Sequence, residues 1–157
     1  MGIKLIKVGR LELPKIHELY VQIFKEYLDK YHDDVVNPSN ISLEKLEEHH
    51  ERFDGYHFIF HEKQLVGTIE IIHINWDSQD KIYLSNLGIL PQYRNQGLAQ
   101  ALFQTLEKHY QPKDGWELWT LAQEAGNRHL YEKLGYQLTG KSKKVNDLMD
   151  VIEYTKK

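Results

Sequence analysis

The chain has 157 residues, of which 41% are hydrophobic and 27% charged, and its formal net charge is −3. These values are typical of one globular domain and exclude a disordered or fibrous protein. The slight acidic excess argues against a general binder of nucleic acids, which needs a basic surface. Because the chain contains no cysteine, a disulfide framework, a thiolate metal site and a cysteine nucleophile are also excluded.

The start of the chain, its apolar runs and its histidines indicate where the protein is located and whether it binds a metal ion. The start MGIKLIKVGR lacks the apolar core of a signal peptide, and no later run is long enough to cross a bilayer. We therefore expect a cytoplasmic protein that binds neither membranes nor nucleic acids. His57 and His61 would stand about 13 Å apart on a strand, too far to share a metal ion. No metal site is expected.

The first third of the chain predicts one strand and two helices. Ile3 to Val8 alternates apolar and polar residues, as a half-buried strand does. After Pro14, apolar residues recur at three- and four-residue steps, which predicts an amphipathic helix. Asp33 to Asn40 is typical of a loop. Ser42 is suited to cap a second helix, which ends at Gly55.

The rest of the chain alternates strand and helix patterns. A helix is expected after Gly97, and a shorter one from Asn127 to Leu134. Gly135 is suited to the left-handed backbone conformation that commonly follows the last residue of a helix. Strand patterns occupy six further segments: 56–62, 65–76, 81–90, 116–122, 136–141 and 150–155. This order predicts an α/β (α+β) fold, in which about four helices flank a mixed central sheet of about six to seven strands.

The segment LGILPQYRNQGLA joins a strand to a helix through a proline, an arginine and a glycine. The first N–H groups of a helix are unpaired and attract anions. The segment therefore predicts a pyrophosphate cradle formed by the side chain of Arg94 and the backbone of Asn95, Gln96, Gly97, Leu98 and Ala99. A tight connection with a surface arginine is the competing interpretation. The segment itself contains neither a dinucleotide-binding fingerprint nor a Walker fingerprint.

Two motifs follow one another in the second half of the chain. LGILPQYRNQGLAQALFQTLE combines a strand end, a proline and the pattern R-x-x-G-x-A, and NRHLYEKLGY contains Leu-Tyr-Glu-Lys-Leu-Gly-Tyr. Together they resemble the GNAT superfamily of acyl-CoA-dependent N-acetyltransferases, whose order of elements the chain shares almost throughout. The resemblance implies a single GNAT-like domain over residues 1–157, with a mostly antiparallel sheet. A splay between the fourth and fifth strands would hold the pantetheine arm of acetyl-CoA (coenzyme A).

The resemblance also implies roles for single residues. The backbone of Leu87 and Ile89 would pair with the amides of the cofactor. Tyr131 would be the catalytic residue that assists departure of the coenzyme A thiolate; the alternative is that it only packs its helix against the sheet. Asn127 would contact the cofactor or act as a helix N-cap. In much of the family the asparagine lies earlier, near Glu124 here.

The implied reaction transfers an acetyl group from acetyl-CoA to a primary amine by direct attack in a ternary complex. The acceptor would be a small molecule or a peptide, and the protein a monomer or a homodimer. A non-catalytic acyl-CoA sensor or regulatory module on the same fold is the alternative. In the family, the two early helices build the acceptor wall, where these residues are candidates: Glu26, Tyr27, Tyr31 and Glu47.

The base that deprotonates the amine is the open point. Many family members carry a glutamate on the strand before the cradle, but KIYLSNLGIL contains no carboxylate. Glu70 and His73 on the preceding strand point to opposite faces, so at most one reaches the site. Their competing interpretations are a solvated face for Glu70 and a partly buried strand histidine for His73. A water relay past Ser85 or Asn86 is a third route.

Overall fold

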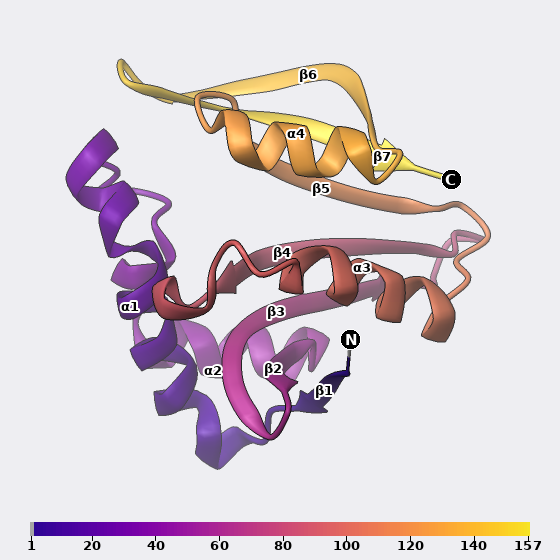
Figure 1. Cartoon of the computed structure of the whole chain (residues 1–157), viewed down its shortest axis with the longest axis horizontal. Coiled ribbons are helices and arrows are strands. Elements are labelled where there is room, and N and C mark those ends of the chain that lie inside the picture. The colour runs from indigo at the N-terminus through magenta and orange to yellow at the C-terminus, as the bar shows by residue number, and fades with distance from the viewer. Residues whose placement is uncertain (1) are drawn as a thin grey trace.

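The computed structural model describes residues 2–157, which form a seven-stranded sheet with helices on both faces (Figure 1). Only β4 and β5 are parallel neighbours, and every other pair is antiparallel. The expected mixed, mostly antiparallel sheet is thus confirmed. In spatial order the strands are β1 (Ile3–Lys7), β2 (Tyr56–His61), β3 (Gln64–Ile74), β4 (Lys81–Ile89), β5 (Trp116–Leu121), β7 (Met149–Lys156) and β6 (Gln137–Asn146).

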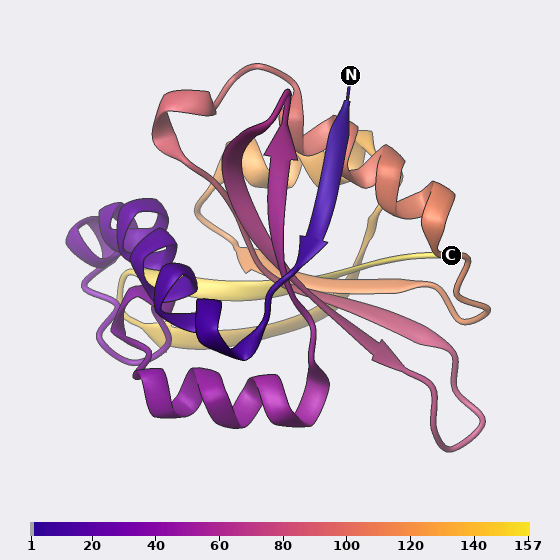
Figure 2. The ribbon, with the colours of Figure 1, turned by 90° about the horizontal axis from the view of Figure 1, so that it is seen from below.

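Four α-helices flank this sheet, as expected. One face carries α1 (Leu13–Tyr31) and α2 (Leu43–Phe53), and the other carries α3 (Leu98–His109) and α4 (Ala125–Lys133) (Figure 2). Ser42 caps α2, since its side chain accepts a hydrogen bond from the N–H of Lys45 at 3.1 Å.

Several predicted boundaries were wrong, two of them in the last third of the chain. The helix expected from Asn127 begins two residues earlier, at Ala125. The strand expected over 136–141 continues to Asn146 and pairs with β7 over most of its length. Its residues are largely exposed, so hydrophobic periodicity carried little information about this strand.

Apolar side chains form one core on each face of the sheet. Tyr20, Phe58 and their neighbours are buried beneath α1 and α2. Phe103, Trp116 and Tyr154 belong to the core beneath α3 and α4. Burying one such side chain stabilises the fold by about 1.5–3 kcal/mol, so these two clusters hold the helices on the sheet.

The strands β4 and β5 separate along their length (Figure 1). Their pairing covers only three positions, the last of which joins Leu84 to Leu118. Just beyond, Asn86 has a left-handed backbone with φ 48°, and the β3–β4 register shifts between Thr68 and Glu70. The extra residue is a β-bulge, which bends the strand that carries it. The splay expected between the fourth and fifth strands is confirmed, and the bulge coincides with its start.

Gly88 allows α1 to pack closely on the end of β4. A Cβ atom at Gly88 would stand 2.3 Å from Cγ2 of Ile23. Any larger residue would push α1 away from the splay. This contact places the aromatic face of α1 opposite α4.

Candidate active site

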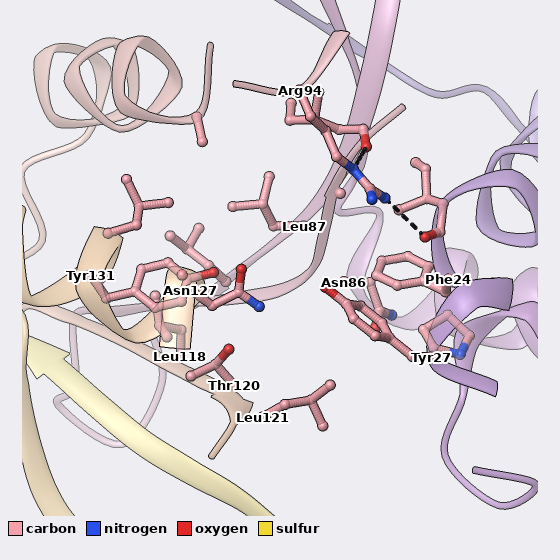
Figure 3. Close-up of a pocket in the computed structure, with 18 of the residues that line it drawn as sticks. Phe24, Tyr27, Asn86, Leu87, Arg94, Leu118, Thr120, Leu121, Asn127 and Tyr131 are labelled. Atoms are coloured by element: carbon pink, nitrogen blue, oxygen red, sulfur yellow. Dashed lines mark hydrogen bonds between the residues drawn. The ribbon is translucent and has the colours of Figure 1, made fainter. Parts of the chain in front are cut away.

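A cavity of about 550 Å³ lies in the splay. Its walls come from β4, β5 and β7, from the N-terminal part of α3, from α4, and from α1 with the loop that follows it. In Figure 3, Tyr131 and Asn127 lie on one side of this cavity, and Phe24 and Tyr27 lie on the other.

The predicted cradle forms one end of the cavity. Asn95 and Gly97 have left-handed backbones, with φ 62° and 75°, which turn the chain from β4 into α3. No side chain caps α3. In the part of the chain that the structure describes, the N–H groups of residues 95–99 have no backbone acceptor. An uncapped helix end with free N–H groups is suited to bind a diphosphate, so these residues fit the phosphates of coenzyme A.

Of the predicted cradle residues, Asn95, Gly97, Leu98 and Ala99 line the cavity, whereas Gln96 does not. The backbones of Leu87 and Ile89 lie on the part of β4 that has no pairing with β5. On that side the backbone of Leu87 is free for a ligand that enters the splay, whereas the carbonyl of Ile89 accepts a hydrogen bond from Arg94. Their predicted pairing with the cofactor stays a prediction.

Arg94 lines the cavity, but its guanidinium is bound within the protein. Nε donates to the carbonyl of Ile89 at 3.0 Å, and Nη2 donates to the carbonyl of Ile23 at 3.2 Å (Figure 3). Nη1 contacts the carboxylate of Glu26. These contacts fasten the end of β4 to α1. Any contact between Arg94 and a phosphate stays a prediction.

Tyr131 lies on α4 and lines the cavity. Its ring is edge-on to those of Phe103 and Tyr136, with centroids at 5.8 and 6.1 Å. Burial raises the pKa of the Tyr131 phenol well above its usual range. The hydroxyl therefore keeps its proton near neutral pH and can serve as a hydrogen-bond donor or an acid.

Asn127 lies one turn before Tyr131, and its side chain points into the cavity (Figure 3). Because α4 begins at Ala125, the N-cap interpretation of Asn127 was wrong: the N-cap is Glu124. The carboxylate of Glu124 does not cap the helix. It accepts hydrogen bonds from the hydroxyl of Tyr31 at 2.8 Å and from Nζ of Lys30 at 3.0 Å.

The candidate acceptor-wall residues occupy different places. Tyr27 lines the cavity and faces α4 (Figure 3). Tyr31 joins α1 to Glu124, whereas Glu26 contacts Arg94 and Glu47 contacts Arg10. Of the four, only Tyr27 presents its side chain to the cavity.

The two base candidates lie in opposite surroundings. His73 is 43% exposed, does not line the cavity, and pairs with Asp80 at 2.6 Å. Glu70 is only 1% exposed, so the expectation of a solvated face was wrong. The helix α2 covers it and places Nδ1 of His49 against its Oε2. Burial raises the pKa of Glu70 to about 8.

Glu70 lies one strand away from the cavity. It pairs with Ser85, whose neighbour Asn86 lines the cavity at the β-bulge. Asn86 is the one sign of this bulge at the level of sequence, because asparagine tolerates the left-handed backbone better than most residues. Within residues 2–157, no group of His, Asp or Glu side chains is arranged to hold a metal ion.

Over residues 13–136 the sequence matches the profile described as the Acetyltransferase (GNAT) family. The chain therefore belongs to this family, and the resemblance drawn from its two motifs is confirmed. No curated protein matches the sequence significantly. No helix in residues 2–157 has the length and apolar character needed to span a membrane.

Solved structures share the fold over nearly the whole chain. A GNAT acetyltransferase from Streptococcus agalactiae has a TM-score of 0.72 at 17% identity and covers 100% of this chain and 97% of its own. Spermidine N-acetyltransferase from Vibrio cholerae, solved with coenzyme A and spermine, has 0.70 at 20% identity, with coverages of 98% and 94%. The ribosomal-protein-S18-alanine N-acetyltransferase from Escherichia coli has 0.70 at 17% identity, with coverages of 98% and 92%.

Proposed function

We propose that this protein is an N-acetyltransferase that transfers the acetyl group of acetyl-CoA to a primary amine by direct attack in a ternary complex. The observation that carries the proposal is one cavity that combines a free helix N-terminus with the buried hydroxyl of Tyr131. The similar fold of an enzyme solved with coenzyme A supports the choice of cofactor.

The cradle binds and orients the cofactor. The N–H groups of residues 95–99 hold the diphosphate, and each hydrogen bond to a charged group contributes about 1.5–3 kcal/mol. The backbone of β4 at Leu87 and Ile89, on the side that faces the splay, pairs with the pantetheine amides, and Asn127 contacts the same arm. When bound, acetyl-CoA supplies a thioester whose carbonyl carbon accepts the amine. Holding both reactants in line lowers the barrier by about 7–11 kcal/mol.

Tyr131 acts where the thiolate leaves. Its raised pKa keeps the phenol protonated, so the hydroxyl can donate a hydrogen bond or its proton to the departing sulfur. Packing against Phe103 and Tyr136 fixes the ring, which keeps the hydroxyl directed at one point of the cavity.

The proton of the acceptor leaves toward the β3 side of the splay. A lysine-like ammonium has a pKa of ~10.4, so the amine needs a base. A carboxylate with a pKa of about 8 is a stronger base than an ordinary glutamate and is therefore better suited to accept the proton of the amine. Because Glu70 does not line the cavity, it acts through a relay of water past Ser85 and Asn86. His73 is not part of this route, since it is exposed and paired with Asp80.

The acceptor is the amine of a small molecule or a peptide. The similar structures include enzymes named for spermidine and for the alanine of ribosomal protein S18, so the fold serves both kinds of acceptor. The protein acts as a monomer or a homodimer.

The test measures thiol release from acetyl-CoA with a panel of amines, together with titration of coenzyme A. Turnover with at least one amine, lost on Tyr131→Phe, is the expected result. Cofactor binding without turnover of any amine would instead favour the sensor alternative. Absence of cofactor binding would refute both.

A further inference from the structure

One buried carboxylate lies on the acceptor side of the cavity. Asp33 follows α1, lines the cavity, and is only 4% exposed. Its Oδ1 accepts a hydrogen bond from the N–H of Val36 at 3.0 Å. No hydrogen bond or ion pair from residues 2–157 reaches its Oδ2. The carboxylate therefore keeps one oxygen that can accept a hydrogen bond from a ligand in the cavity.

The charges that line the cavity are few. Among the described residues only Arg94 and Asp33 present ionic side chains to it. Arg94 belongs to the cradle end, and Glu26 and two carbonyl oxygens occupy its guanidinium. Lys30, the last lysine of α1, is bound to Glu124. Asp33 therefore has no cation of its own.

The wall that carries Asp33 is largely apolar and aromatic, and its other polar side chains are uncharged. It includes Phe24 and Tyr27 of α1 and, across the cavity, Trp119, Met149 and Val151. Aromatic and aliphatic side chains of this kind pack well against a methylene chain, and aromatic rings also attract a cation. The wall thus combines an apolar surface with one anionic group.

This inference rests on the proposed function. We infer that the acceptor is a diamine or a longer polyamine, in which one amino group reacts at the splay while a second, protonated one binds Asp33. Asp33 is then a specificity-determining residue of the acceptor site. The reacting amine does not sit on Asp33, because a carboxylate beside it would hold its proton and oppose the attack.

The experiment compares α,ω-diaminoalkanes with n-alkylamines of the same length. Each is titrated into the protein saturated with coenzyme A, and each is assayed with acetyl-CoA. We expect the best diamine to bind about 10- to 100-fold more tightly than its monoamine partner, as one charge-assisted hydrogen bond implies. In the assay, the preference is expected in KM rather than in kcat.

Asp33→Asn is the matched variant, because asparagine keeps an Oδ1 acceptor for the N–H of Val36 and removes only the charge. It should abolish the diamine preference and leave the affinity for coenzyme A unchanged. Asp34→Asn, at the exposed neighbouring position, is the control and should keep the preference.

Equal binding of diamines and monoamines by the unaltered protein would overturn the inference. So would a preference that survives Asp33→Asn. Failure of the proposed function gives a different pattern, in which no amine is acetylated; the titrations still decide the role of Asp33 in that case.

Discussion

The two ends of the cavity are built in different ways. The cradle end consists of consecutive residues, 94–99, and among the described residues the N–H groups of 95–99 have no backbone acceptor. The acceptor end is assembled from α1, its following loop, β5 and β7, which are distant in sequence. Side-chain contacts hold α1 to the elements that flank β5 and β7: Tyr31 donates to Glu124, the N-cap of α4, and the amide of Asn146, at the end of β6, donates to the carbonyl of Tyr31 at 2.9 Å.

This difference separates the part of the site that tolerates changes of sequence from the part that determines which acceptor is bound. Backbone donors do not depend on side-chain identity, so the cradle can stay the same while most of the sequence changes. A wall of side chains changes with each substitution. The similar structures fit this division, since enzymes that share the fold at 17–20% identity are named for different acceptors.

The largest effect is expected at Gly97, where the cradle depends on the backbone. Gly97→Asp places a negative charge at the N-terminus of α3, which repels the diphosphate and caps the free N–H groups. We expect the affinity for coenzyme A to fall about 1,000-fold, as the loss of two charged hydrogen bonds implies. Calorimetric titration measures it.

Gly97→Asn is the matched control, since asparagine is neutral and also tolerates the left-handed backbone. It should bind coenzyme A within about tenfold of the unaltered protein. If the two variants bind coenzyme A equally well, the cradle does not hold the phosphates.

Tyr131→Phe tests the proposed role of the tyrosine hydroxyl in thiolate departure. Without the hydroxyl, the departing thiolate loses its donor, and kcat should fall about 100-fold while KM for acetyl-CoA changes little. Tyr136→Phe is the control, because that buried hydroxyl has no hydrogen-bond partner among the described residues and does not line the cavity. Equal kcat values for the two variants would show that Tyr131 only packs α4 against the sheet and takes no part in the reaction.

Glu70→Gln tests the buried carboxylate by its effect on stability. An unfolded glutamate titrates near ~4.3, whereas the folded pKa is about 8. Between these values the unfolded chain loses a proton that the folded chain keeps, so the stability of the protein falls as the pH rises. The variant should therefore gain at least ~2 kcal/mol relative to the unaltered protein between pH 5 and pH 9.

Urea denaturation at both pH values measures this gain. A relative stability that does not change with pH would show that Glu70 ionises normally in the folded protein. The rate of acetyl transfer should rise more steeply with pH in the unaltered protein than in the variant, because ionisation of the carboxylate adds to the deprotonation of the amine itself.

The smallest effect is expected where side chains tie the acceptor wall together. Tyr31→Phe removes one hydrogen bond to Glu124 but leaves the one from Lys30. The free energy of unfolding should fall by about 0.5–1.5 kcal/mol, and KM for the amine should rise a few-fold. KM for acetyl-CoA should stay the same; an equal rise in both would mean that this contact supports the whole cavity.

The sequence predicted those parts of the candidate site that are formed by residues close together along the chain. The proline, Arg94 and Gly97 mark the turn from β4 into α3, and the second motif places Tyr131 on a helix. Both are local patterns, whose meaning depends on backbone geometry within a few residues. The fold class was predictable for the same reason, because periodicity reports the type of each element.

The tertiary structure decided how these elements meet. It buried Glu70 beneath α2, directed Arg94 into α1, bound Glu124 to Tyr31, and left Asp33 facing the cavity. None of these outcomes follows from local sequence, because burial and hydrogen-bond partners are set by residues far away along the chain. The chain alone thus fixed the type of each element and the position of the cradle, whereas the surroundings of each charged side chain depended on long-range packing.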